Sequence, residues 1–194
     1  MSGARPLGNG TMARMGRVIY YTAVSLDGFI TDAHSALDWL FRHESDPDGA
    51  LGWNAFNARI GALVMGRTTY DWLVDGPLAD PGASWPHHQP CWVLTTRPAP
   101  DPLPGADVRF THAQAAQVVQ DMRAVAGARD LWCVGGGRTA AWLHAAGLLD
   151  EVWVSIAPEI LGAGTPLLGA AAALELVEVS RNQDFVTGRY LVRR

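Results

Sequence analysis

The sequence predicts a single α/β domain with a mainly parallel central sheet. As far as residue 157, apolar segments typical of strands alternate with segments of helical periodicity, the pattern of a parallel sheet connected by helices. Residues 174–193 instead contain two strand-like segments close together, which predicts a C-terminal antiparallel hairpin. No internal repeat or linker divides the chain. We therefore expect a disordered leader at 1–16 and one domain at 17–194.

Strands are predicted from β-branched and aromatic residues and from short apolar runs. Residues 17–25 are rich in both residue types and lack a helical period. The continuous apolar run at 60–66 is typical of a strand that is buried on both faces. Further strands are expected at 91–96, 106–110, 131–134, 150–158, 174–180 and 184–193.

The clearest helical pattern covers residues 113–127, which present apolar side chains on one face and end in glycine. A short helix is predicted at 67–73, where Thr68 and Asp71 have the spacing of a capping box. Another follows the glycines at 135–137. Residues 53–59 and one turn at 36–42 are the remaining helical candidates, and 74–90 is expected to form a long surface loop.

Composition excludes several classes of protein. Apolar residues make up 48% of the chain and charged residues 18%, as in ordinary globular domains. The net charge of −4 and the lack of a basic stripe argue against a nucleic-acid partner. No apolar run reaches the ~18 residues that a membrane span needs, and no signal peptide is recognisable, so a cytoplasmic protein is expected. Cys91 and Cys133 lie in predicted strands and indicate buried thiols, and no metal site is expected.

Three strand ends carry residues suited to anions. At "CVGGGRTAA", a strand enters a helix through Gly135, Gly136 and Gly137, which leaves the first helical N–H groups without a side-chain partner. Such groups bind phosphates, although a tight turn without a ligand is the alternative. The G-x-G-x-x-A pattern also resembles a Rossmann fingerprint, but it lies late in the chain and lacks the acidic residue that should close the next strand.

The other two junctions combine arginine with hydroxyl groups. In "MGRTTY", Gly66 ends a strand and Arg67, Thr68 and Thr69 open a helix; arginine is unfavourable there unless an anion lies beside it. In "LTTRP", Thr95, Thr96 and Arg97 end a strand. Ligands of open α/β sheets bind beyond the carboxyl ends of the strands, so the three junctions together predict a phosphate cleft.

These motifs, in order with "TAVSLDGFI" and "DEVWVSIAPEILGAGTPLL", resemble the dihydrofolate reductase superfamily. Within it, residues 17–193 are most similar to the branch of the C-terminal reductase domain of bacterial riboflavin-biosynthesis deaminase-reductase. The resemblance implies a dihydrofolate reductase-like fold: a mixed sheet of about eight strands, flanked by helices, with NADPH across the carboxyl ends. It also implies a homodimer and a cis peptide bond in the glycine turn, expected at Gly135–Gly136.

The resemblance carries over to individual residues of the cofactor site. Arg67, Thr68 and Thr69 would meet the adenosine phosphates, and Thr96 and Arg97 the 2′-phosphate. Residues 135–139, Thr139 included, would hold the pyrophosphate, and Arg138 would reach the adenosine side. Ala23 and Ile30 would lie along the nicotinamide.

The substrate end is less defined by the residues. Asp27 matches the aspartate that the branch carries after its first strand, with an Asp-Gly turn as the alternative. Asp38 resembles the pterin-binding carboxylate of folate reductases, with an acid in the first turn of a helix as the alternative. Asp27 and Asp38 are the candidate acids, and Asp27, Trp39 and Trp53 are the candidate substrate contacts.

The leading hypothesis is an NADPH-dependent reductase that transfers hydride to a small nitrogen heterocycle or its ribosylamino or ribityl precursor, as in a riboflavin-type pathway. A dihydrofolate or pterin reductase is one alternative. A non-catalytic NADPH-binding module or sensor is the alternative from another class, and it predicts cofactor binding without turnover.

Overall fold

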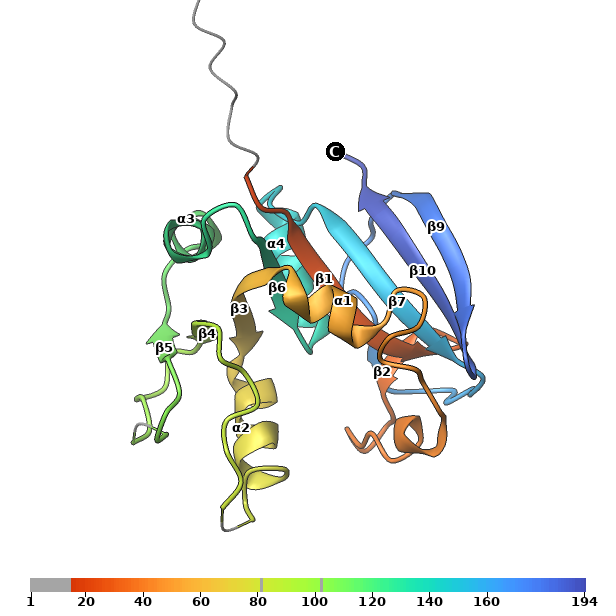
Figure 1. The fold of residues 1–194 in the computed structure, drawn as a ribbon, viewed down its shortest axis with the longest axis horizontal. Helices are drawn as coiled ribbons and strands as arrows, with labels where there is room; N and C mark the ends of the chain where they lie inside the picture. Colours follow the sequence, from red (N-terminus) through yellow and green to blue (C-terminus); the bar gives the residue numbers. More distant parts are fainter. Residues whose placement is uncertain (1–14, 81, 102) are drawn as a thin grey trace, which may run out of the picture.

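A computed structural model describes residues 15–80, 82–101 and 103–194, so most of the predicted leader lies outside the described residues. Its main element is an eight-stranded sheet in the order β5-β4-β3-β6-β1-β7-β10-β9 (Figure 1). The strands are β1 (Val18–Ser25), β3 (Ile60–Gly66), β4 (Cys91–Leu94), β5 (Val108–Thr111), β6 (Asp130–Val134), β7 (Glu151–Ala157), β9 (Leu174–Asn182) and β10 (Phe185–Val192). A separate small ladder pairs β2 (Phe29–Thr31) with β8 (Thr165–Pro166).

The strands from β5 to β7 are all parallel, and β10 runs antiparallel to both β7 and β9. This arrangement confirms the predicted α/β class, the mainly parallel sheet and the C-terminal hairpin. Residues 162–169, where no strand is predicted, contain β8, which pairs with β2, the short strand that follows β1.

Helices cover both faces of the sheet (Figure 1). They are α1 (Trp53–Ala58), α2 (Arg67–Asp75), α3 (Ala115–Ala126) and α4 (Gly137–Ala145), with a 3₁₀ turn at Leu40–Arg42. One core cluster joins side chains of α3 and α4 to one face of the sheet, and a second joins α1 and α2 to the other. In β3, Val64 faces the first cluster and Leu63 the second, which confirms the strand buried on both faces that the apolar run at 60–66 predicts. Within the described residues, no helix is long and apolar enough to cross a membrane.

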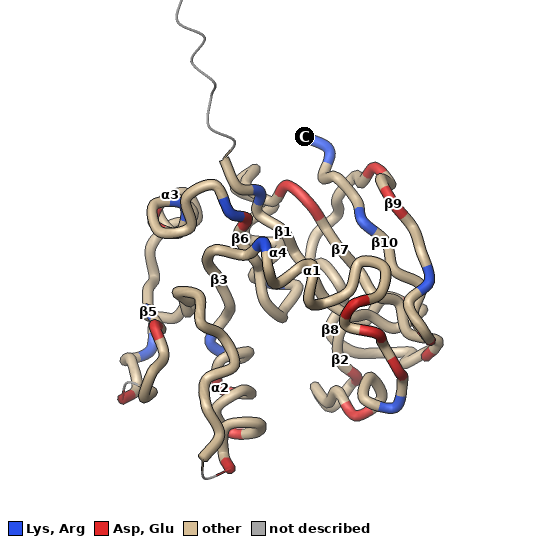
Figure 2. Tube along the Cα trace, viewed as in Figure 1, with Lys and Arg blue, Asp and Glu red and all other residues tan. Residues whose placement is uncertain are grey.

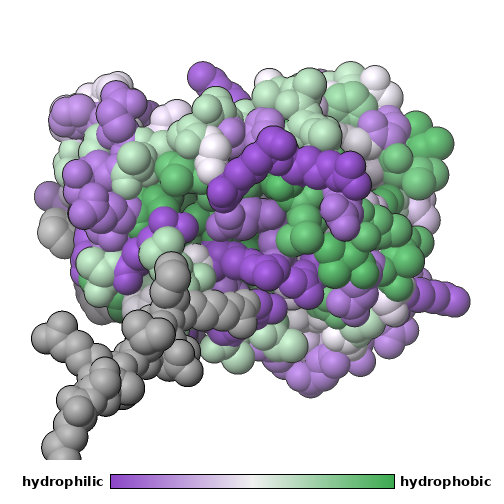
Figure 3. All heavy atoms as spheres, turned by 90° about the horizontal axis from the view of Figure 1, so that it is seen from above, coloured by the Kyte–Doolittle hydropathy of each residue, from purple (hydrophilic) through white to green (hydrophobic). Residues whose placement is uncertain are grey.

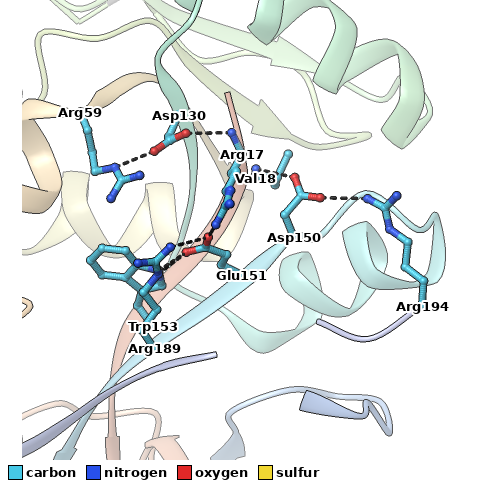
Figure 4. A network of polar contacts seen from close by, with 9 residues as sticks. All are labelled: Arg17, Val18, Arg59, Asp130, Asp150, Glu151, Trp153, Arg189 and Arg194. Carbon is cyan, nitrogen blue, oxygen red and sulfur yellow. Dashed lines mark hydrogen bonds and ion pairs between the residues drawn. The ribbon is translucent and has the colours of Figure 1, made fainter. Parts of the chain in front are cut away.

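The amino ends of the central strands are tied together by buried carboxylates (Figure 4). The carboxylate of Glu151 is fully buried and accepts bonds from Arg17, from Arg189 at 2.9 and 3.0 Å, and from the indole N–H of Trp153 at 2.6 Å. Beside it, Asp130 accepts the backbone N–H of Arg17 at 2.8 Å and the Nε of Arg59 at 2.6 Å. These charged groups are paired within the protein, so this edge stabilises the fold.

Candidate functional site

The three anion-suited junctions meet at the opposite edge of the sheet. Because β4, β3 and β6 are parallel neighbours, their carboxyl ends lie next to one another. The turn from β3 into α2 and the turn from β6 into α4 are therefore adjacent, and the segment after β4 flanks the first of them. The prediction that these segments form one site rested on the rule for open α/β sheets, and the topology brings them to one edge.

The two glycine turns are in direct contact. A Cβ atom added to Gly135 would lie 2.5 Å from Thr69 Oγ1, and one added to Gly66 would lie 3.1 Å from Thr139 Oγ1. Gly135 also has a φ of +76°, a conformation that side-chain-bearing residues rarely adopt. Glycine is thus required at 135 for both backbone conformation and space. Each turn places a threonine against the glycine of the other.

Neither helix has a side-chain cap at this edge. The N-cap residues of α2 and α4 are Gly66 and Gly136, and neither end has a side-chain capping bond. The predicted capping box between Thr68 and Asp71 is therefore wrong, because the Asp71 carboxylate binds two arginines instead. Two helix N-termini with uncapped N–H groups, each at the positive end of a helix dipole, can accept anions.

Arg67 and Arg97 share the carboxylate of Asp71. The Nε of Arg67 donates to Asp71 Oδ1 and the Nη2 of Arg97 to Oδ2, both at 2.6 Å. Arg67 also donates to the carbonyl of Pro98 at 3.1 Å, which links α2 to the segment after β4. Partial burial would raise the pKa of Asp71, but the bonds and charges of the two arginines outweigh it and hold that pKa below its usual value.

The glycine turn at 135–137 has one packed and one open side. A Cβ at Gly137 would meet the carbonyl oxygens of Pro166 and Leu167 at 2.6 Å, whereas one at Gly136 would meet nothing within 4 Å. The expected cis peptide at Gly135–Gly136 is wrong: the described residues contain no cis bond, and the positive φ of Gly135 makes the turn. Space beside Gly136 allows a ligand to approach the backbone.

The remaining predicted cofactor residues lie around these turns. Arg138 and Thr96 are exposed, while Thr139 is buried against the neighbouring turn. The hydroxyl of Thr95 accepts the backbone N–H of Arg97 at 3.0 Å and so shapes its loop. In the first-strand segment, Ala23 is half-buried on β1 and Ile30 is buried in the core.

The carboxylate of Asp27 is held by hydrogen bonds within the protein. Its carboxylate accepts the hydroxyl of Ser25 at 2.6 Å and the backbone N–H groups of Leu161 and Gly162 at 3.1 and 2.7 Å. The Ser25 hydrogen bond, together with the backbone bonds, lowers the pKa of Asp27 despite some desolvation. An ionised aspartate with these partners anchors the turn at 161–162 to the end of β1. The sequence offered no signal for this long-range role.

The other predicted substrate residues lie apart. Trp39 is buried against Ala157, at the carboxyl end of β7, and its neighbour Asp38 is exposed. Trp53 lies on α1, where its ring meets that of Trp132 edge-on with the centroids 5.1 Å apart. The structure thus places Trp39 and Trp53 in different clusters.

The donors at this edge suit a ligand with several phosphate groups. The two uncapped helix ends, the open side of Gly136 and the paired arginines are donors for several anionic groups, and no acidic side chain other than Asp71 bonds to those arginines in the described residues. The site would take phosphates at its two turns and an additional charge at the arginines.

Comparisons with known proteins agree with this geometry. Residues 17–184 match the family model of the RibD C-terminal domain. The uncharacterized Bacillus subtilis (strain 168) proteins YwjB and YyaP are 28% and 29% identical over 153 and 158 residues; each alignment covers 78% of this chain, and 82% and 79% of theirs.

Two solved structures show the same architecture. A protein assigned to riboflavin biosynthesis from Shewanella sp. PV-4 superposes with a TM-score of 0.76 at 27% identity, covering 92% of this chain and 99% of that one. The deaminase/5-amino-6-(5-phosphoribosylamino)uracil reductase of Thermotoga maritima gives 0.63 at 14% identity, and the match covers 92% of this chain and 57% of that one. This chain belongs to the RibD C-terminal domain family, and its fold is that of the dihydrofolate reductase-like reductases.

Proposed function

We propose that this protein is an NADPH-dependent reductase that delivers hydride to a small nitrogen heterocycle or to its ribosylamino or ribityl precursor. One observation carries the proposal: two uncapped, mutually packed glycine turns and a pair of arginines meet at the carboxyl edge of the sheet. Family membership and the uracil reductase named among the structural relatives support a reductase and the heterocyclic substrate class.

Each part of the edge has a role in this proposal. The turn at 135–139 holds the pyrophosphate through its backbone N–H groups, because Gly136 leaves room for close approach. The turn at 67–69 meets the adenosine phosphates, and Thr96 and Arg97 bind the 2′-phosphate. Bound NADPH supplies the hydride, while the protein orients the nicotinamide along β1 near Ala23.

We propose a choice between the two candidate acids from their contacts. Both carboxylate oxygens of Asp27 already accept hydrogen bonds from Ser25 and from the turn at 161–162, so Asp27 suits positioning rather than a direct action on substrate. Asp38 is exposed, and its neighbour Trp39 packs on the last residue of β7. We therefore favour Asp38 over Asp27 as the carboxyl group that acts on substrate.

Fluorescence titration with NADPH and NADH tests the cofactor. Removing one charged hydrogen-bonding partner should weaken NADPH binding about 10- to 100-fold in Arg97→Ala and leave NADH binding nearly unchanged. Arg109→Ala is the matched control, since Arg109 also forms an exposed pair with an aspartate, Asp107, but on β5. Equal binding of both cofactors by the wild type would contradict the proposal.

Turnover separates the reductase from its main alternative. Oxidation of bound NADPH is followed by absorbance against a panel of pyrimidine, ribosylaminopyrimidine, pterin and folate substrates. Consumption with the pyrimidine compounds is expected. Tight NADPH binding without oxidation against any of them would favour a non-catalytic binding module, and oxidation with folate or pterin alone would favour the folate reductase alternative.

We further propose a homodimer formed through the C-terminal hairpin. Leu176 and Val179 on the outer strand β9, and Val186 on β10, share one face by cross-strand register and are 49–59% exposed. Figure 3 shows hydrophobic side chains gathered on this side of the molecule. Light scattering should report a dimer for the wild type and a monomer for L176E. V125E, at an exposed apolar residue on α3, is the control and should remain a dimer. A monomeric wild type would refute this proposal.

A further inference from the structure

Asp71 occupies an unusual position at the proposed phosphate site. It lies one turn into α2, four residues after Arg67 and 26 before Arg97, and its two carboxylate oxygens each accept one guanidinium at 2.6 Å. It is the one acidic side chain that bonds to these two arginines within the described parts of the chain. A carboxylate repels a bound anion, so its position beside a proposed phosphate site needs an explanation.

The two arginines depend on Asp71 to different degrees. Arg67 is also held by the carbonyl of Pro98, and its guanidinium lies over the rings of Tyr70 and Phe110 at 5.7 and 5.8 Å. The side chain of Arg97 is 57% exposed, and in the described residues Asp71 is the only group that its guanidinium bonds. Loss of the carboxylate would therefore release Arg97 rather than Arg67.

The bonds to Asp71 do not use up the arginine donors. Arg67 uses Nε and Nη1, and Arg97 uses Nη2, so Nη2 of Arg67 and both Nε and Nη1 of Arg97 have no partner in the described part of the protein. Each guanidinium carries five N–H donors, so a phosphate can bind while both arginines remain paired with Asp71.

We propose that Asp71 is a positioning residue that sets the preference for a 2′-phosphate by holding Arg67 and Arg97 side by side. The inference rests on the proposed NADPH function. Two guanidinium groups repel each other, and a shared carboxylate offsets this repulsion before the ligand arrives. It also orders a long exposed side chain in advance, so that binding does not have to supply that entropy.

The test measures NADPH and NADH affinity for Asp71→Asn by fluorescence titration, with thermal unfolding of the free protein as a fold check. NADPH binding should weaken about tenfold while NADH binding changes less than about threefold, because Arg97, the arginine that depends on Asp71, binds only the 2′-phosphate. Asp71→Glu keeps the charge and should restore most of the preference. Asp75→Asn is the matched control, since Asp75 is an exposed acid on the same helix.

A double-variant cycle shows whether Asp71 acts through Arg97. In an Arg97→Ala background, Asp71→Asn should cause no further loss of NADPH affinity, since the side chain it positions is absent. Unchanged or tighter NADPH binding by Asp71→Asn would overturn the inference, as would equal losses for both cofactors. A wild type that does not prefer NADPH would refute the proposed function itself, and this inference with it.

Discussion

Replacing Gly135 by alanine tests the packing of the two turns at the proposed site. The substitution places a Cβ at a φ of +76° and 2.5 Å from Thr69 Oγ1. Backbone strain at such a conformation costs about 1–3 kcal/mol. Overpacking adds about 1–3 kcal/mol, so the free energy of unfolding should fall by about 2–6 kcal/mol in Gly135→Ala.

Urea denaturation followed by tryptophan fluorescence measures this loss, and a second substitution separates its two parts. Thr69→Ala removes Oγ1 and Cγ2, the two atoms nearest to the added Cβ. The double variant should therefore recover the packing part, about 1–3 kcal/mol, but not the strain. Gly136→Ala is the control, because its Cβ meets nothing within 4 Å. A Gly135→Ala protein as stable as wild type, or additive effects at 135 and 69, would refute the contact between the turns.

Two further predictions concern stability away from this contact. Burial, with a smaller effect from the neighbouring charge of His88, lowers the pKa of His87 to about 4. The unfolded chain then binds a proton that the native state rejects between pH 6.5 and 4, so stability should fall by about 2–3 kcal/mol as the pH drops through this range. Urea denaturation across these pH values should show that His87→Gln removes this component and His88→Gln does not. Glu151→Ala leaves Arg17 and Arg189 facing each other without their buried carboxylate and should cost about 3–5 kcal/mol in urea denaturation. Glu175→Ala, which removes an exposed ion pair, is the control and should cost under about 1 kcal/mol. Unchanged stability in Glu151→Ala would show that the buried pairs contribute nothing.

Sequence patterns predicted the elements of this fold well, because their signals are local. The apolar run at 60–66 and the glycines at 135–137 appear as β3 and as the turn into α4, and parallel topology then brings the three strand ends together. Partnerships between distant residues could not be predicted in this way. Thr68 and Asp71 have capping-box spacing, but Arg97 competes for the carboxylate from 26 residues away.

The same limit applies to the substrate residues. The residues next to Asp27 predict only an Asp-Gly turn. Its partners at 161–162 lie 134 and 135 residues further along the chain. Trp39 and Trp53 are both aromatic residues near one loop, yet the fold assigns them to separate clusters. Composition and spacing carry no signal for either outcome, because both depend on which strand ends the loops reach.

Charged groups at the amino edge of the sheet are paired within the protein, whereas those at the carboxyl edge keep free donors, and this contrast indicates where a ligand binds. Figure 2 shows charged residues at both edges. At the amino edge, Glu151 and Asp130 are buried, and their oxygens accept bonds from arginines and backbone N–H groups. These charges therefore stabilise the fold and leave no free carboxylate oxygen for a ligand.

At the carboxyl edge, two helices begin at Gly66 and Gly136 without a capping side chain, and Arg67 and Arg97 keep donors free while Asp71 orders them. Uncapped N-termini and adjacent cations lower stability when no anion is bound. A protein that stabilises one edge with closed ion pairs can retain such donors at the other. It follows that an anionic ligand should raise stability, and that the 2′-phosphate cofactor should raise the thermal midpoint more than its unphosphorylated counterpart at equal concentration.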